Sequence, residues 1–174
     1  MAAAATALLL ATAGCSTTNS NPAASSPGAS GKKLQVVATT GYLGDAVKNI
    51  APEAQVSVLV APGGDPHTQA LSTADAERVQ SADVVVWTSH DMEHHMMEQL
   101  DKLGKKQVAA GEAIPEADLL PWKEDGQVKG HDPHVWNSPD NWTHVVTAIA
   151  KKLSEIDAPN AAKYQANAEA YNKK

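Results

Sequence analysis

The chain of 174 residues has a single cysteine, Cys15, and no phenylalanine, and its aromatic residues are four tryptophans and three tyrosines. One cysteine excludes an intrachain disulfide framework. No apolar run reaches the roughly 18 residues of a transmembrane helix. The formal net charge is −6, and no block of Lys and Arg interleaved with aromatics occurs. Nucleic acid is therefore not an expected partner.

Residues 1–15 are small and apolar and end in Ala13-Gly14-Cys15. A short apolar run that ends in small residues predicts an export signal rather than a membrane span. Small residues before a cysteine resemble the bacterial lipobox, in which that cysteine becomes the lipidated first residue of the mature protein. The alternative is an ordinary signal peptide with an incidental cysteine. Residues 16–33 are rich in Ser, Asn, Pro, Ala and Gly, which predicts a flexible tether.

Strand and helix patterns alternate from residue 34 onward. Apolar runs at 34–38, 56–60, 83–87 and 107–109 predict four strands. Helices are predicted over 42–50, 72–80, 91–103, 139–156 and 159–174, and a loop over 111–130. Three consecutive valines at 84–86 favour a strand buried on both faces, as in parallel sheets. The pattern predicts an α/β fold with a mostly parallel four-stranded sheet flanked by helices, and ligands bind such sheets at the carboxyl ends of the strands.

The residues most suited to a functional site are the seven histidines, namely His67, His90, His94, His95, His131, His134 and His144. Neutral imidazole is the commonest metal ligand in proteins. His67 and His134 each end an Asp-Pro-His triplet in a predicted loop. Proline fixes its own backbone torsion, and the aspartate can orient a ring nitrogen. Both histidines are therefore candidate metal ligands.

Several segments together resemble one protein family. They are Pro62-Gly63-Gly64-Asp65-Pro66-His67, Ser72-Thr73-Ala74-Asp75, Ser81-Ala82-Asp83-Val84-Val85-Val86, Asp132-Pro133-His134-Val135-Trp136 and the run from Asp157 through Tyr171. In order and spacing they resemble the zinc and manganese ABC transporter substrate-binding lipoproteins, the cluster A-I metal-binding proteins. The resemblance covers residues 33–174.

The resemblance implies the N-terminal lobe of a bilobal binding protein, with residues 34–158 as the lobe and 159–174 as the start of an interlobe helix. It implies that His67 and His134 are ligands, with the remaining ligands supplied by a second lobe. The implied protein is an exported monomer, lipid-anchored through Cys15 at the outer face of the cell membrane, and not an enzyme. It captures a divalent metal ion, Zn²⁺ first and Mn²⁺ next, and delivers the ion to an ABC permease. The sequence does not decide between zinc and manganese.

The other candidates have plainer interpretations. His131 stands three residues before His134, so it is a possible accessory ligand. His90 and His94 are four residues apart, a spacing that on a helix would place both on one face, where solvent exposure is the expectation. His95 is expected at the edge of the apolar stripe that the helix predicted over 91–103 buries, which is formed by Met92, Met96, Leu100 and Leu103. His144 is expected at a helix surface, and Glu93 is expected to be structural, near a helix start. Met92, Met96 and Met97 are expected in the core rather than at a soft-metal site.

Two rival functions remain at this point. In a zinc-dependent hydrolase His67 and His134 would hold a catalytic zinc, but such sites have three protein ligands and a general base, and no His-Glu-x-x-His helix is present. A surface adhesin, with a role in cell adhesion, is compatible with a tether, but no residue argues for it. Metal capture needs neutral imidazole, so affinity is expected to fall below about pH 6.

Overall fold

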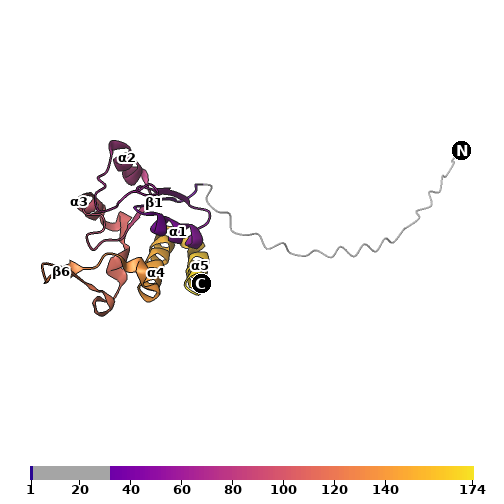
Figure 1. Ribbon diagram of the computed structural model, residues 1–174. Coiled ribbons are helices and arrows are strands. Elements are labelled where there is room, and N and C mark those ends of the chain that lie inside the picture. Colours follow the sequence, from indigo (N-terminus) through magenta and orange to yellow (C-terminus); the bar gives the residue numbers. More distant parts are fainter. Residues whose placement is uncertain (2–31) are drawn as a thin grey trace.

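The computed structural model describes residue 1 and residues 32–174. The predicted export signal, the lipobox cysteine Cys15 and nearly all of the predicted tether lie outside the described residues. The described part forms one lobe built around a single central sheet (Figure 1).

The sheet has four strands, β1 (Gln35–Ala38), β2 (Gln55–Val58), β3 (Val84–Trp87) and β4 (Gln107–Ala109), in the order β2-β1-β3-β4. All neighbouring strands are parallel, and Val36 pairs with both Val56 and Val84. The two central strands are rich in valine, which suits strands covered on both faces. The predicted α/β class and the predicted four-stranded sheet are confirmed.

Helices cover both faces of the sheet (Figure 1). On one face lie α1 (Gly41–Ile50), α4 (Pro139–Ile156) and α5 (Ala161–Tyr171), and on the other lie α2 (Thr73–Ser81) and α3 (Met97–Asp101). Successive strand residues point to opposite faces. Val84 and Val86 therefore pack with the first group of helices, whereas Val85 packs with the second.

Local capping interactions mark the starts of two helices. The Ser72 side chain accepts a hydrogen bond from the backbone of Asp75, and the Asp75 carboxylate accepts one from the backbone of Ser72, which is a capping box at the start of α2. At the start of α4 the Ser138 side chain accepts a hydrogen bond from the backbone of Asn141, and Pro139 occupies the first helical position. The bounds of α4 match the prediction.

The last helix packs inside this lobe. Tyr164 and Ala168 of α5 are 6% and 4% exposed and belong to the core shared with α1 and α4. The Asn167 amide donates to the Ile50 carbonyl at 2.8 Å, and the Tyr171 hydroxyl donates to Asp45 at 2.9 Å. The apolar side chains of α5 are thus buried against the lobe itself. Within residues 32–174, no helix is both long and apolar enough to cross a membrane.

The helix predicted over 91–103 is wrong for its first half. Ser89, His90 and Asp91 have φ angles of 74°, 51° and 66°, which lie in the left-handed region and do not belong to an α-helix. Residues 91–96 form turns, and α3 begins at Met97. The predicted apolar stripe is nevertheless buried, because Met92, Met96 and Leu100 are all fully inaccessible.

The loop predicted over 111–130 is also wrong. It contains β5 (Pro121–Glu124), which pairs antiparallel with β6 (Gln127–His131). Asp125 and Gly126 join the strands with φ angles of 50° and 75°, the signs that a type I′ turn requires. Short 3₁₀ turns occupy Gly104–Lys106, Ala110–Ala113, Glu116–Asp118, Val135–Asn137 and Ala158–Asn160.

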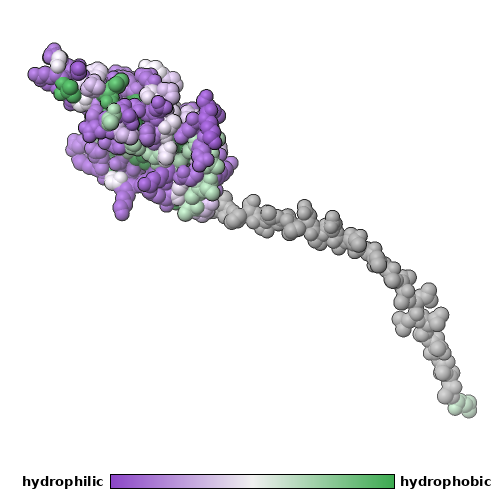
Figure 2. Space-filling view, turned by 90° about the horizontal axis from the view of Figure 1, so that it is seen from below, coloured by the Kyte–Doolittle hydropathy of each residue, from purple (hydrophilic) through white to green (hydrophobic). Residues whose placement is uncertain are grey.

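The β5–β6 hairpin exposes apolar side chains. Leu120 is 68% exposed, Trp122 42% and Val128 63%. Apolar surface is visible at the end of the lobe opposite the grey trace (Figure 2). Trp122 also lines the cavity that the candidate site occupies, so this hairpin forms one of its walls.

Candidate metal centre

The candidate site is a cavity of about 880 Å³ whose wall includes five of the seven histidines. It is lined by His67, His90, Asp91, His94, Trp122, Glu124, Lys129, Gly130, His131, Pro133 and His134. His67 follows β2 and His90 follows β3, so both come from the carboxyl ends of parallel strands. That edge of the sheet is where α/β proteins bind ligands.

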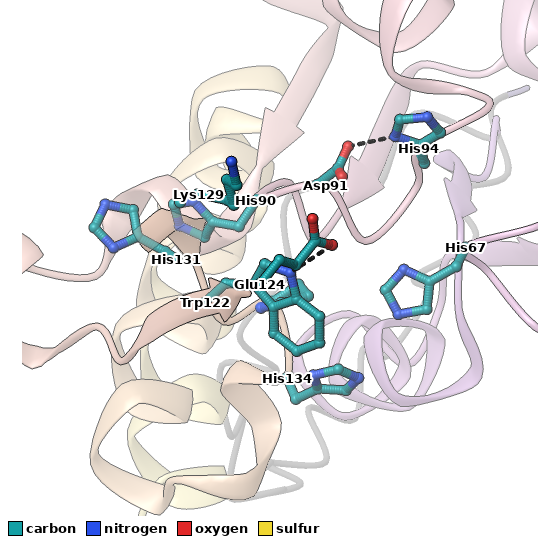
Figure 3. Close-up of a pocket in the computed structure, with 11 residues that line it drawn as sticks. His67, His90, Asp91, His94, Trp122, Glu124, Lys129, His131 and His134 are labelled. Carbon is teal, nitrogen blue, oxygen red and sulfur yellow. Dashed lines mark hydrogen bonds and ion pairs between the residues drawn. The ribbon is translucent and has the colours of Figure 1, made fainter. Parts of the chain in front are cut away.

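His67 and His134 lie on one side of this cavity, with their rings turned toward each other (Figure 3). Their ring centroids are 5.6 Å apart, with an angle of 54° between the ring planes. Two imidazoles that bind one zinc ion at a tetrahedral angle, through nitrogens about 2.1 Å away, have centroids roughly 5.3 Å apart. The structure thus brings together the two histidines that the sequence singled out, at a separation that suits one shared ion.

The two Asp-Pro-His triplets are held by their aspartates. Oδ1 of Asp65 accepts a hydrogen bond from the backbone nitrogen of His67 at 3.0 Å. Oδ1 of Asp132 accepts one from the backbone nitrogen of His134 at 2.9 Å and also lies 2.7 Å from the Nδ1 atom of the same ring. A proton on Nδ1 leaves Nε2 of His134 as the free donor of an electron pair.

Electrostatics keep Asp132 in its ionised form. Burial alone would raise its pKa, but the backbone and side-chain hydrogen bonds from His134 outweigh burial and hold the pKa below its usual value. A carboxylate that stays ionised can fix the tautomer and the orientation of the neighbouring ring.

Aromatic packing orients His134 further. Its ring meets Trp136 edge-on, with centroids 5.3 Å apart, and Trp136 stacks on Tyr42 at 4.2 Å. The Tyr42 hydroxyl lies 2.9 Å from Oγ1 of Thr88, and burial raises the pKa of Tyr42 to about 12. Trp136 is therefore a packing residue, and it packs against the candidate ligand itself.

Glu93, which is expected to be structural, is a buried carboxylate. It is fully inaccessible and lies in a turn before α3 rather than at a helix start. Its Oε1 accepts hydrogen bonds from Oγ1 of Thr39 at 2.6 Å and from the backbone of Thr88 at 2.8 Å, and Oε2 accepts one from the backbone of Ser89 at 3.1 Å. Desolvation raises the pKa of Glu93 above its usual value. Glu93 thus ties the end of β1 to the turn that carries His90.

The structure separates the remaining histidines into two groups. His94 is exposed, as expected, and pairs with Asp91 at 2.7 Å, and His95 is exposed as well. His90 is not on a helix face and is not solvated, because its side chain is only 8% exposed. His131 lies beside His90, across the cavity from His67 (Figure 3). His144 lies on α4, half-buried and outside the cavity lining.

Within the described residues, no three His, Cys, Asp or Glu side chains are grouped closely enough to hold a metal ion together. The two facing imidazoles therefore form a two-donor set. Structural zinc sites close with four ligands, so a two-donor set leaves positions for water or for further protein groups.

Comparison with known proteins agrees with this architecture. Residues 36–174 match a family model described as the periplasmic component A of a zinc-uptake complex. The chain belongs to this family, the substrate-binding proteins of metal ABC transporters. Among relatives, it is 37% identical over 143 residues to the manganese-binding lipoprotein MntA of Bacillus subtilis, covering 80% of this chain and 46% of MntA. It is 35% identical over 131 residues to the zinc-binding protein TroA of Treponema pallidum, covering 74% and 41%.

Solved structures show the same fold. The periplasmic zinc-binding protein TroA superposes with a TM-score of 0.75 at 32% identity, covering 82% of this chain and 51% of that structure. Zinc-bound AdcA of Streptococcus pneumoniae gives 0.69 at 29% identity, covering 82% and 30%. The chain spans about half the length of the curated relatives it matches or less.

Proposed function

We propose that this chain captures a divalent transition-metal ion outside the cytoplasm and passes it to an ABC permease, with His67 and His134 as its two imidazole ligands. The observation that carries the proposal is the 5.6 Å separation of the two ring centroids at the carboxyl edge of the sheet. Zinc is the first candidate because two nitrogen donors favour zinc over manganese. Manganese is the second, because one relative is named a manganese-binding lipoprotein.

Metal titration of the purified chain tests the ligands. His67→Ala and His134→Ala should each lower zinc affinity at least about tenfold, because each removes one of two donors. His144→Ala is the matched control, since this histidine lies on α4 and does not line the cavity. Binding by both alanine variants at the affinity of the parent chain would overturn the assignment. With two donors, the chain should bind zinc more weakly than a two-lobed relative, so nanomolar affinity would contradict the two-donor site.

Export and lipid anchoring through Cys15 are part of the same proposal. Support comes from the apolar run before this cysteine and from relatives named as lipoproteins. Radiolabelled palmitate fed to a bacterial host should label the chain and place it in the membrane fraction. Cys15→Ala should abolish both the label and the membrane association. Export without labelling of the parent chain would instead identify a soluble secreted form.

The proposal is of a binding protein acting as a monomer, not of an enzyme. A catalytic zinc has three protein ligands and an open position, whereas residues 32–174 offer no group of three donors. Hydrolysis of ester or peptide substrates by the zinc-loaded chain, lost in His67→Ala, would favour the hydrolase instead.

A further inference from the structure

A second pair of histidines lies in the same cavity. The ring centroids of His90 and His131 are 5.4 Å apart, with an angle of 74° between the ring planes. This separation is close to that of His67 and His134 and to the roughly 5.3 Å expected for two imidazoles on one zinc ion. The two pairs occupy opposite sides of the cavity (Figure 3).

His90 has a buried ring nitrogen without a partner. Its side chain is 8% exposed, yet Nε2 makes no hydrogen bond to any described residue. A buried polar atom left unpaired costs free energy, and it calls for an explanation such as a bound ion. Nε2 is thus available as a donor to an ion between His90 and His131.

A carboxylate lies near Nδ1 of His90, at a longer distance than the 2.7 Å between Asp132 and Nδ1 of His134. A carboxylate oxygen of Glu112 lies 3.6 Å from Nδ1 of His90, as Asp132 lies beside Nδ1 of His134. A carboxylate on that side favours the tautomer with the proton on Nδ1, which leaves Nε2 free for a metal. Histidines that bind metals commonly have such a partner on the other nitrogen.

The buried position of the His90 ring depends on an unusual backbone conformation and on a neighbouring glycine. His90 and its two neighbours, Ser89 and Asp91, all have positive φ, and Glu93 holds this turn by accepting two backbone hydrogen bonds. A Cβ atom at Gly111 would lie 2.9 Å from Cδ2 of His90 and 2.5 Å from the carbonyl oxygen of Thr88. The absence of a side chain at Gly111 therefore lets His90 occupy its buried position.

The charges around the cavity favour a cation slightly. Asp91 and Glu124 contribute two carboxylates to the lining, and Lys129 contributes one ammonium group. The negative side chains are partly engaged, Asp91 with His94 and Glu124 with Trp122.

We propose that His90 and His131 form a second, weaker site for a borderline transition-metal ion such as Zn²⁺ or Co²⁺, at the opposite side of the cavity from His67 and His134. Two imidazoles hold the ion, and water completes its coordination. This inference depends on the proposed function only in the choice of a transition-metal ion. The two ligands of the second site, His90 and His131, are not ligands of the first site.

Histidine ring NMR during zinc titration tests the second site. The sample is the full chain without an affinity tag, with Cys15→Ser, because a free thiolate would itself bind zinc. Ring signals of His90 and His131 should shift at higher zinc concentration than those of His67 and His134, and equilibrium dialysis should give two ions per chain. His131→Asn should weaken the second binding step at least about tenfold and leave the first unchanged.

Two variants guard the result against misfolding and against nonspecific binding. His90→Gln repeats the test at the other ligand, with backbone NMR signals reporting that the fold persists, and His144→Asn is the matched control outside the cavity. Uptake of one ion that shifts only His67 and His134 would overturn the inference. Shifts confined to His90 and His131 would support it while refuting the proposed function.

Discussion

Asp132 contacts His134 at two points, the backbone nitrogen and the ring nitrogen Nδ1, whereas Asp65 accepts a hydrogen bond only from the backbone nitrogen of His67. The two Asp-Pro-His triplets are identical in sequence but differ in this contact. The ring of His134 is therefore held in one orientation and one tautomer by its own loop, and no equivalent carboxylate contact fixes the ring of His67 among the described residues.

The first prediction concerns this difference. Asp132→Asn should weaken zinc binding about 10–100-fold, because it removes the ionised group that orients a candidate ligand. Asp65→Asn should have a smaller effect, because the asparagine oxygen can still accept the backbone hydrogen bond of His67. Titration of both variants against a chromophoric chelator measures the two affinities. Equal losses in the two variants would show that the contact of Asp132 with the ring has no special role.

The second prediction concerns the pH dependence of stability. The pKa of Glu93 is raised in the folded state, from an unfolded value of about 4.3. Its contribution to stability is therefore fully present below about pH 4 and is lost as the pH rises through the folded pKa. Glu93→Gln removes this titration and places an amide N–H₂ near backbone donors, which should cost about 1–3 kcal/mol at pH 4.

Urea unfolding of both proteins at pH 4, 5, 6 and 7 checks the sign. The gap in unfolding free energy between the parent chain and Glu93→Gln should narrow as the pH rises. Asp75 and Asp83, whose pKa values are lowered, lose their stabilising effect only on acidification and do so equally in both proteins. A gap that widens with pH would mean that the pKa of Glu93 is not raised.

The third prediction tests the packing of α1 on the sheet. A Cβ atom at Gly44 would lie 2.7 Å from Cγ2 of Val58, so Gly44→Ala should destabilise the lobe by about 1–3 kcal/mol. Gly41→Ala, in the same helix, meets nothing within 4 Å and should leave stability unchanged or slightly higher. Thermal unfolding of the pair gives the comparison. A stable Gly44→Ala variant would show that β2 can move away from the helix.

The fourth prediction concerns the hairpin that lines the cavity. Gly126 has a φ of 75°, so Gly126→Ala should weaken the turn by about 1 kcal/mol and open the hairpin more often. Trypsin should then cleave at Lys123 and Lys129 several-fold faster, and fluorescence of Trp122 should shift. Gly130→Ala is the control, because its added Cβ meets nothing within 4 Å and its φ is not positive. An unchanged cleavage rate would show that the turn does not determine the stability of the hairpin.

The sheet and most helices were predictable because their signals are local. Valine runs mark β1 and β3, and Ser138 with Pro139 marks the start of α4. The order of the strands, β2-β1-β3-β4, was not predicted, because local sequence signals do not say which strands become neighbours. The pair of candidate ligands was predictable as well, since two identical triplets stand in loops that this topology places at one edge.

The hairpin was missed although its signal is present. Asp125-Gly126 is a strong two-residue turn signal, but the charged and exposed residues around it favoured a loop. The burial of His90 had no such local signal. It depends on the hydrogen bond between Glu93 and Thr39, 54 residues away, and on the space left by Gly111. Contacts between distant segments of this kind are not encoded in the periodicity of either segment.

His67 and His134 stand 67 positions apart, and the intervening chain contains α2, β3, α3, β4 and the hairpin. An ion shared by both rings would be a cross-link that closes this long loop. Because such an ion binds the folded lobe and leaves the unfolded chain, an ion at a hundred times its dissociation constant adds about 2.7 kcal/mol to the stability of the folded state. Binding of the ion and stability of the lobe would then be coupled. The lobe with the ion bound would resist unfolding and proteolysis better than the lobe without it, and dissociation of the ion would make the segment between the two histidines less stable.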